Sequence, residues 1–206
     1  MTSRTLRLTF LSYWHAGTGR GQGADLDAVC LRTAGGLPCF PGRALKGLLR
    51  EGLVLAGAEP PEIAALLGSD LRVRVEASST GKASEEAVER ALTDGRFQST
   101  PGAIQLGSAR VGLPEERAAC ERWGASHRSA GAAFFERLSS TAIDADGVAR
   151  DKTLRSIEVA LPISLHSTVT GAPDHLDRLA SAFPLVRAAG AHRARGLGRC
   201  TLEYLV

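Results

Sequence analysis

The stretch WHAGTGRGQGADLDAVCLRTAGGLPCFPGRALKGLLR, residues 14–50, decides how the rest of the chain is organised. Its glycine-rich first part can take positive φ values and leaves backbone amides open to an anion. Its last part begins a helix after Pro41, with Arg43 and Lys46 in the first turns, where the helix dipole already favours negative charge. Helix stability alone would not place cations there, so a bound polyanion is the better explanation.

Outward from that stretch, the hydrophobic pattern predicts an α+β chain. Leu6, Leu8 and Phe10 alternate with other residues over 4–14, which is typical of a strand with one buried face. Leucines at helical spacing predict a helix over 43–56. The other expected elements are a strand at 28–32, a helix at 62–67, a strand at 103–111, a helix at 114–123, a hairpin with its turn at 144–147, a strand-like segment at 153–170 broken near Pro162, a helical segment at 174–190 broken near Pro184, and a strand at 200–206.

The length of 206 residues suits one domain, 1–206. Within it, residues 69–102 are polar, rich in small residues and weakly periodic, apart from a helix expected over 85–92. We therefore expect a flexible insertion at 69–102.

Composition excludes several protein classes. The four cysteines form no C-x-x-C pair, so neither a zinc ribbon nor a disulfide framework is indicated. The N-terminus lacks the apolar run of a signal peptide, and no stretch approaches the roughly eighteen apolar residues of a membrane span. We therefore expect a soluble, cytoplasmic protein without a membrane partner.

Charge is distributed unevenly along the chain. Residues 1–50 contain seven Arg or Lys against two acids, and residues 187–199 contain four arginines and no acid, although the net charge is only +3. This asymmetry predicts a basic face built from both chain ends, as expected of a nucleic-acid-binding protein. Accidental clustering on a solvated surface is the alternative.

Two motifs have the glycines of nucleotide-binding loops but lack other essential parts. The glycines at 17–23 do not open a helix, as a dinucleotide-binding fingerprint requires. Ala83 occupies the position where a phosphate loop needs the Ser or Thr that binds magnesium. His15 and His192 lie beside glycine-rich basic loops and are candidate functional groups, although a lone histidine is usually structural.

Three segments together resemble the repeat-associated RNA-binding (RAMP) proteins of CRISPR systems. The first is HAGTG at 15–19, followed by Asp27 and by GLPCFPGRALKGLLR at 36–50. The second, HRARGLGR at 192–199, resembles the glycine-rich loop before the last strand of that superfamily. The third, at 141–158, is similar to a hairpin and strand of the backbone subunits of type III effector complexes.

The resemblance implies a ferredoxin-like (RRM-like) βαββαβ core with insertions, which agrees with the order of elements expected above. It also implies a backbone subunit that binds guide RNA and target RNA beside other subunits of a CRISPR effector complex, including copies of itself. Contacts to phosphates and 2′-hydroxyls are expected to dominate, because only 5% of the residues are aromatic. The expected RNA-binding residues are His15, Gly17, Gly19, Arg20, Arg43, Lys46, Arg50, His192, Arg193, Arg195, Gly196, Gly198 and Arg199.

Cleavage of the target RNA is implied by the same resemblance. Type III backbone subunits carry an aspartate in the loop after the first strand that is needed, with a divalent metal ion, to cut the target. Asp27 lies close to that place, one residue nearer the turn at 36–38 than the family pattern implies, and Asp25 is the reserve candidate. Asp27 would bind the metal ion, for which Mg²⁺ is expected, or orient a 2′-hydroxyl for attack on the adjacent phosphate. On its residue type alone, Asp27 could equally cap a turn or pair with Arg20.

Three functions therefore remain open. The first is a guide-RNA-binding backbone subunit that cleaves target RNA through Asp27, as a metal-dependent endoribonuclease acting within a complex. The second is a non-catalytic structural or capping subunit of the same complex. The third is a guide-RNA-processing endoribonuclease that uses His15 or His192 as general acid or base.

Overall fold

The computed structural model describes residues 1–23, 25–68 and 100–205. The helix predicted over 85–92, and all but the last three residues of the insertion predicted at 69–102, lie outside these residues. No helix in the described part of the chain is both long enough and apolar enough to cross a membrane.

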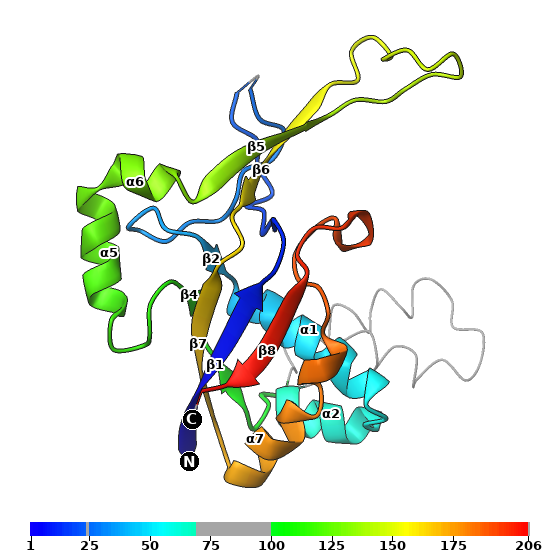
Figure 1. Ribbon diagram of the computed structural model, residues 1–206. Coiled ribbons are helices and arrows are strands. Elements are labelled where there is room, and N and C mark those ends of the chain that lie inside the picture. The colour runs from blue at the N-terminus through cyan, green and yellow to red at the C-terminus, as the bar shows by residue number, and fades with distance from the viewer. Residues whose placement is uncertain (24, 69–99, 206) are drawn as a thin grey trace.

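An antiparallel sheet forms the centre of the structure, and the strand that alternates from Leu6 to Phe10 lies inside it, next to the edge strand (Figure 1). This strand, β1 (Thr2–Phe10), pairs on one side with β8 (Cys200–Tyr204) and on the other with β7 (Ser164–Gly171). The α+β class predicted from the sequence is confirmed. Beyond β7 lie three short strands: β3 (Gln105–Leu106), β4 (Ala109–Arg110) and β2 (Cys39–Phe40).

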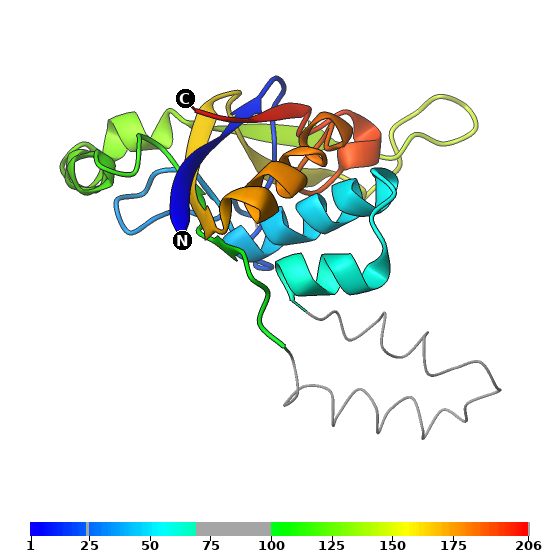
Figure 2. The same ribbon diagram turned by 90° about the horizontal axis from the view of Figure 1, so that it is seen from below.

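Three helices lie on the same side of this sheet: α1 (Gly42–Leu55), α2 (Pro60–Leu67) and α7 (Pro173–Ala180) (Figure 2). Each large apolar side chain that the two layers bury stabilises the fold by roughly 1.5–3 kcal/mol relative to an exposed one. The core between the layers includes Leu6, Leu8, Leu45, Leu49, Leu53, Leu165, Val169, Leu176 and Leu179, all fully buried.

A two-stranded hairpin, β5 (Phe135–Ser140) and β6 (Arg155–Ala160), extends away from the main sheet (Figure 1). Near its far end the Asp144 carboxylate accepts hydrogen bonds from the amides of Asp146 (3.0 Å) and Val148 (2.9 Å), and Gly147 has a φ of 80°. The predicted turn at 144–147 is therefore confirmed, although the hairpin begins earlier in the chain than expected.

Two helices, α5 (Arg117–Ser126) and α6 (Arg128–Ala132), connect β4 to the hairpin. The helix predicted at 114–123 is thus present but shifted toward the C-terminus. In Figure 1 both helices lie beyond the side of the sheet formed by β2 and β4, away from α1 and α2.

The prediction of a strand at 28–32 is wrong. Its residues form isolated bridges instead: Ala28 with Ile157, Cys30 with Gly17, and Arg32 with Pro38. Because these partners come from three separate segments, no continuous ladder can form.

Two further strand predictions were too long. The strand predicted at 4–14 ends at Phe10, and Trp14 bridges to Ala160 of the hairpin. The strand predicted at 103–111 is divided between β3 and β4, because the register with β7 shifts by one residue between the Leu106–Val169 pair and the Arg110–His166 pair. Between them the Gly107 carbonyl accepts from Ser167 Oγ (2.6 Å).

Both predicted proline breaks are confirmed. Pro162 separates β6 from β7, which belong to different sheets. The helical segment predicted at 174–190 divides into α7 and a 3-10 turn, η1 (Phe183–Leu185), that contains Pro184. A second 3-10 turn, η2 (Arg193–Arg195), lies in the loop before β8.

Candidate functional site

The two glycine-rich loops from opposite ends of the chain meet over the first half of α1. The amide of Ala191 donates to His15 O (2.8 Å), and the amide of Gly198 donates to Tyr13 O (2.7 Å). A Cβ added at Gly190 would lie 2.5 Å from His15 O, so only glycine allows this approach. The close packing explains why two distant segments form one surface.

Between these loops and α1 lies a pocket of about 310 Å³, which we name the loop–helix groove. Apolar side chains from Phe40 and Leu48 form much of its wall, while His15, Glu51 and Arg193 supply polar groups. The groove is lined by His15, Ala16, Gly17, Phe40, Pro41, Ala44, Gly47, Leu48, Glu51, Gly190, Ala191 and Arg193.

His15 is held rigidly at the base of the groove. Its side chain is only 4% exposed, and Nδ1 lies 2.6 Å from the carbonyl oxygen of Glu158. The thiol of Cys30 donates to the same oxygen (3.3 Å). Burial, and secondly the charge of Glu158, raise the pKa of Cys30 to about 12, so the group remains a thiol at neutral pH.

Several cations of the terminal segments pair with acids from elsewhere in the chain. Arg193 Nη1, for example, lies 2.9 Å from Glu51 Oε2 on α1 and so fastens the C-terminal loop to that helix. The predicted basic face is therefore partly neutralised. The ion pairs of these two segments include Arg4–Asp177, Arg7–Glu203, Arg32–Glu158 and Arg193–Glu51.

The predicted RNA-binding cations of α1 are not among the residues that line the groove. The Arg50 guanidinium donates to the carbonyl of Gly68 (2.9 Å), just past the C-terminus of α2. Burial, and secondly the nearby charge of Arg50, lower the pKa of Lys46. Arg43, in the first turn of α1, is exposed.

The structure thus brings together part of the predicted set. His15, Gly17 and Arg193 line the groove. His192 is exposed beside it, with its ring centroid 6.5 Å from that of His15. The others lie on the two loops outside the groove: Gly19, Arg20, Arg195, Gly196, Gly198 and Arg199.

Asp27 contacts the β5–β6 hairpin and not α1. Its amide donates to Ser156 O (2.7 Å), and its Oδ2 accepts from the amide of Ser156 (2.8 Å). The side chain therefore ties the loop to the edge of β6 that does not pair with β5. It makes no ion pair with Arg20, the partner considered from the sequence, within the described residues.

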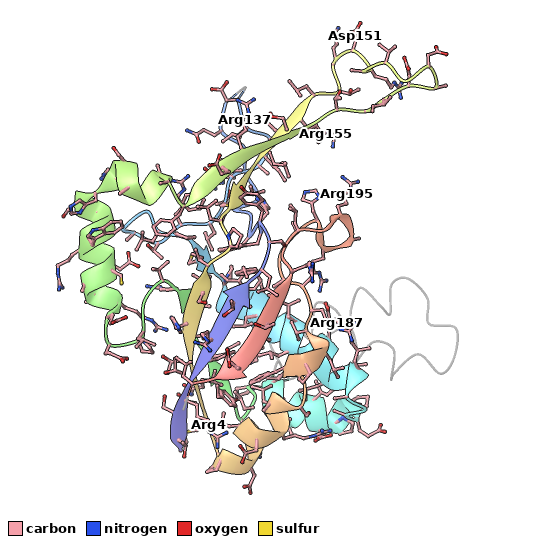
Figure 3. The ribbon with its side chains drawn as sticks, viewed as in Figure 1. Arg4, Arg137, Asp151, Arg155, Arg187 and Arg195 are labelled. Atoms are coloured by element: carbon pink, nitrogen blue, oxygen red, sulfur yellow. The ribbon has the colours of Figure 1, made fainter. Side chains whose placement is uncertain are left out.

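Beside Asp27, the loop and the hairpin enclose a second pocket of about 430 Å³, which we name the hairpin cleft. Asp25 lies on its wall, facing a set of charged groups from the hairpin and from Arg32. Figure 3 shows Arg137 and Arg155 projecting from the hairpin and Arg195 from the η2 turn. The cleft is lined by Gln22, Asp25, Leu26, Arg32, Ala132, Phe135, Glu136, Arg137 and Glu158.

Glu158 separates the two pockets. Its backbone oxygen accepts the hydrogen bond from His15 on the groove side. Its carboxylate, 8% exposed as a residue, pairs with Arg32 on the cleft side and accepts from the amide of Cys30 (2.9 Å). The Arg32 guanidinium in turn lies over the ring of Phe135, with its Cζ atom 3.9 Å from the ring centroid.

Sequence reasoning did not single out Glu158 as a site residue. One signal was available, because Glu158 interrupts an otherwise apolar run from Ile157 to Ala160, and a buried acid requires a partner. The partner itself, Arg32, could not be identified from that run.

The described residues contain no group of three or more His, Cys, Asp or Glu side chains that could hold a metal ion by themselves. Mg²⁺ is often bound through one or two carboxylates with substrate phosphates completing its shell. The exposed carboxylates of Asp25 and Asp27 fit that arrangement, provided that RNA supplies the remaining ligands.

The comparisons with known proteins point in one direction. A family model described as the RAMP superfamily matches residues 7–201. A chain of the cryo-EM structure of the Type III-B Cmr-beta bound to cognate target RNA shares 12% identity at a TM-score of 0.58, covering 99% of this chain and 97% of that one. A chain of the Type III-B Cmr-beta apo structure shares 13% identity at a TM-score of 0.56, covering 98% and 97%. No curated protein sequence matches the chain.

Proposed function

The chain belongs to the RAMP superfamily, and from that premise we propose that it is a guide-RNA-binding backbone subunit of a type III CRISPR effector complex that cleaves target RNA. The observation that carries the proposal is the loop–helix groove, where two glycine loops and α1 meet. Its partners would be guide RNA, target RNA, other subunits of the complex and copies of itself, inside the cytoplasm.

The core fits this assignment. Strands β8, β1, β7 and β4 are neighbours in that order, all pairs are antiparallel, and α1 and α7 lie on one side. We propose that β1, α1, β3–β4, β7, α7 and β8 constitute a ferredoxin-like βαββαβ core, with the hairpin and α5–α6 as insertions. The fold shared with two Cmr-beta chains, one of them in a structure bound to cognate target RNA, supports the placement in such a complex.

The groove has the chemistry of a site for a nucleic-acid backbone. Its glycines carry no side chain, and its wall is apolar at Phe40 and Leu48, so a strand can lie close to the backbone. Exposed cations such as Arg43 and Arg195 flank it and can neutralise phosphates. None of these groups distinguishes one base from another, which suits a subunit that must hold any guide sequence.

The hairpin cleft would receive the target strand. Asp27 has one carboxylate oxygen bound by the Ser156 amide, while the side chain as a whole is exposed. Asp27, with Asp25 in reserve, would share a divalent metal ion with RNA phosphates. The ion would supply charge stabilisation at the scissile phosphate.

A second function is favoured by the same contact. Because Asp27 fastens the loop to β6 through Ser156, the aspartate already has a structural purpose, as a non-catalytic or capping subunit would require. A complex that binds target RNA opposite this subunit and leaves it uncut would support that alternative.

The proposal is tested by purifying the tagged full chain from its native cells and sequencing the RNA that remains bound. We expect short RNAs that contain CRISPR repeat sequence, together with other subunits of the complex. Recovery of no RNA, or of RNA without repeat sequence, would contradict the proposed function.

A further inference from the structure

The hydrogen-bonding state of His15 follows from its surroundings. A carbonyl oxygen can only accept, so the contact of 2.6 Å with Glu158 O means that Nδ1 carries the hydrogen. The sulfur of Cys30, 3.5 Å from Nδ1, does not compete as a thiolate, because its raised pKa of about 12 keeps it protonated. In the neutral imidazole, Nε2 is therefore a hydrogen-bond acceptor.

That acceptor has no partner within residues 1–23, 25–68 and 100–205 and lies next to Gly17 at the groove wall. A Cβ added at Gly17 would be only 2.6 Å from Nε2, so the absence of a side chain at Gly17 keeps the nitrogen open. A polar atom that opens on a pocket is satisfied there by water or by a ligand that supplies the missing donor.

The chemistry of the bound strand identifies the donor. In an RNA backbone the phosphate oxygens, the ring oxygen and the ester oxygens only accept hydrogen bonds. The 2′-hydroxyl is the donor that every ribonucleotide shares, and DNA does not have it. Donors on the bases differ from one nucleotide to the next and would make binding depend on sequence.

We infer that His15 makes the loop–helix groove selective for RNA, by accepting at Nε2 a hydrogen bond from the 2′-hydroxyl of one nucleotide of the bound strand. The inference rests on the proposed function, because it takes the groove to be the guide-RNA site. Gly17 is then a positioning residue, whose missing side chain exposes the acceptor.

The test compares binding of the full chain to a single-stranded RNA and to the 2′-fluoro oligonucleotide of the same sequence. Fluorine cannot donate a hydrogen bond, yet the modified sugar keeps the pucker of RNA. One lost hydrogen bond to a partly buried acceptor predicts that the wild-type chain binds RNA about fivefold to tenfold more tightly.

Two variants remove the acceptor in different ways. His15→Asn keeps a donor near the position of Nδ1 for Glu158 O but has no group at the position of Nε2. Gly17→Ala keeps the histidine but places a methyl group against Nε2, where its Cβ would lie 2.6 Å from the nitrogen unless the ring or the loop shifts. Both variants are expected to bind the two oligonucleotides equally, whereas His127→Asn, at an exposed histidine after α5 and outside the groove, should keep the wild-type ratio.

The outcomes separate the inference from the proposed function. If the wild-type chain binds RNA but shows no preference, or if both groove variants keep the full preference, the role of His15 is overturned and the proposed function stands. If the wild-type chain binds neither oligonucleotide, both are contradicted.

Discussion

The loop–helix groove and the hairpin cleft lie on opposite sides of Glu158, yet they are built from different kinds of groups. The groove is lined mainly by glycines and apolar residues, and its arginine, Arg193, is already paired with Glu51. The cleft is lined by charged side chains, including Asp25 and Arg137. The difference indicates a division of labour, because a surface without large side chains suits holding any strand, whereas exposed carboxylates and guanidiniums suit chemistry at a phosphate.

The largest expected effect is on cleavage. Asp27→Asn keeps an oxygen that can accept from the Ser156 amide but removes the negative charge. We expect the single-turnover rate of target cleavage in the assembled complex to fall by about 100-fold or more, with guide-RNA affinity unchanged within about twofold.

Asp25→Asn is the matched control, since Asp25 lies on the same loop and is also exposed. Unchanged cleavage by the Asp27 variant, with loss in the Asp25 variant, would transfer the role to Asp25. Unchanged cleavage in both would leave the structural-subunit alternative.

Cys30, which contacts Glu158 between the two regions, should be protected from alkylating reagents. Burial raises the pKa of Cys30 to about 12 and that of Cys200 to about 11, so both remain thiols at pH 8, whereas Cys120 is only half-buried. Alkylation by iodoacetamide, followed by mass spectrometry, should modify Cys120 more than about 100-fold faster than Cys30. The rates should converge only as the pH rises toward the pKa of Cys30. Fast labelling of Cys30 at pH 8 would mean that the packing around Cys30 and Glu158 opens.

Replacing Glu158, whose groups face both regions, should destabilise the chain. Glu158→Ala leaves Arg32 and the amide of Cys30 without their partner. Because the Arg32 side chain is 38% exposed, solvent recovers part of the cost, and we expect destabilisation by about 2 kcal/mol. For a chain of this length the melting temperature should fall by roughly 4–8 °C. Glu158→Gln, which can still accept from Cys30, should lose less, and an equal loss in both variants would argue against the hydrogen bond.

The smallest expected effect concerns the rim of the groove. Replacing exposed Arg43 by Ala should reduce the slope of log affinity against log salt by about 0.7, the value for one phosphate contact on a single strand. Arg178→Ala is the control, because Arg178 already pairs with Glu62. The hydrogen bond from Arg178 lowers the pKa of Glu62. An equal change in both variants would indicate a general charge effect and would mean that Arg43 does not contact a phosphate of the bound strand.

Local sequence patterns were sufficient to predict much of the fold. Alternation at Leu6, Leu8 and Phe10 marks β1 because strand periodicity is a property of neighbouring residues. Pro162 and Pro184 end elements for reasons contained in their own rings. The segment at 28–32 was mistaken for a strand because β propensity does not show whether a single neighbouring strand is available to pair with it.

The sites were less predictable because their contacts join distant residues. Arg32 and Glu158 are 126 positions apart, and Asp27 and Ser156 are 129 apart. Charge clustering at the chain ends predicted that the two ends share one face, and the two loops do meet at the groove. It could not reveal that Arg193 is neutralised by Glu51 or that Arg50 donates to the carbonyl of Gly68.

The division between groove and cleft is tested most directly by asking which RNA strand each region touches. The photoreactive residue p-benzoylphenylalanine can replace Ala44 in the groove or Glu136 in the cleft, both of which are exposed. The full chain carrying either substitution would be irradiated with a guide–target duplex whose strands bear different labels. Crosslinks from position 44 to the guide strand and from position 136 to the target strand are predicted. Crosslinking of both positions to the same strand, or to the opposite strands, would contradict the division.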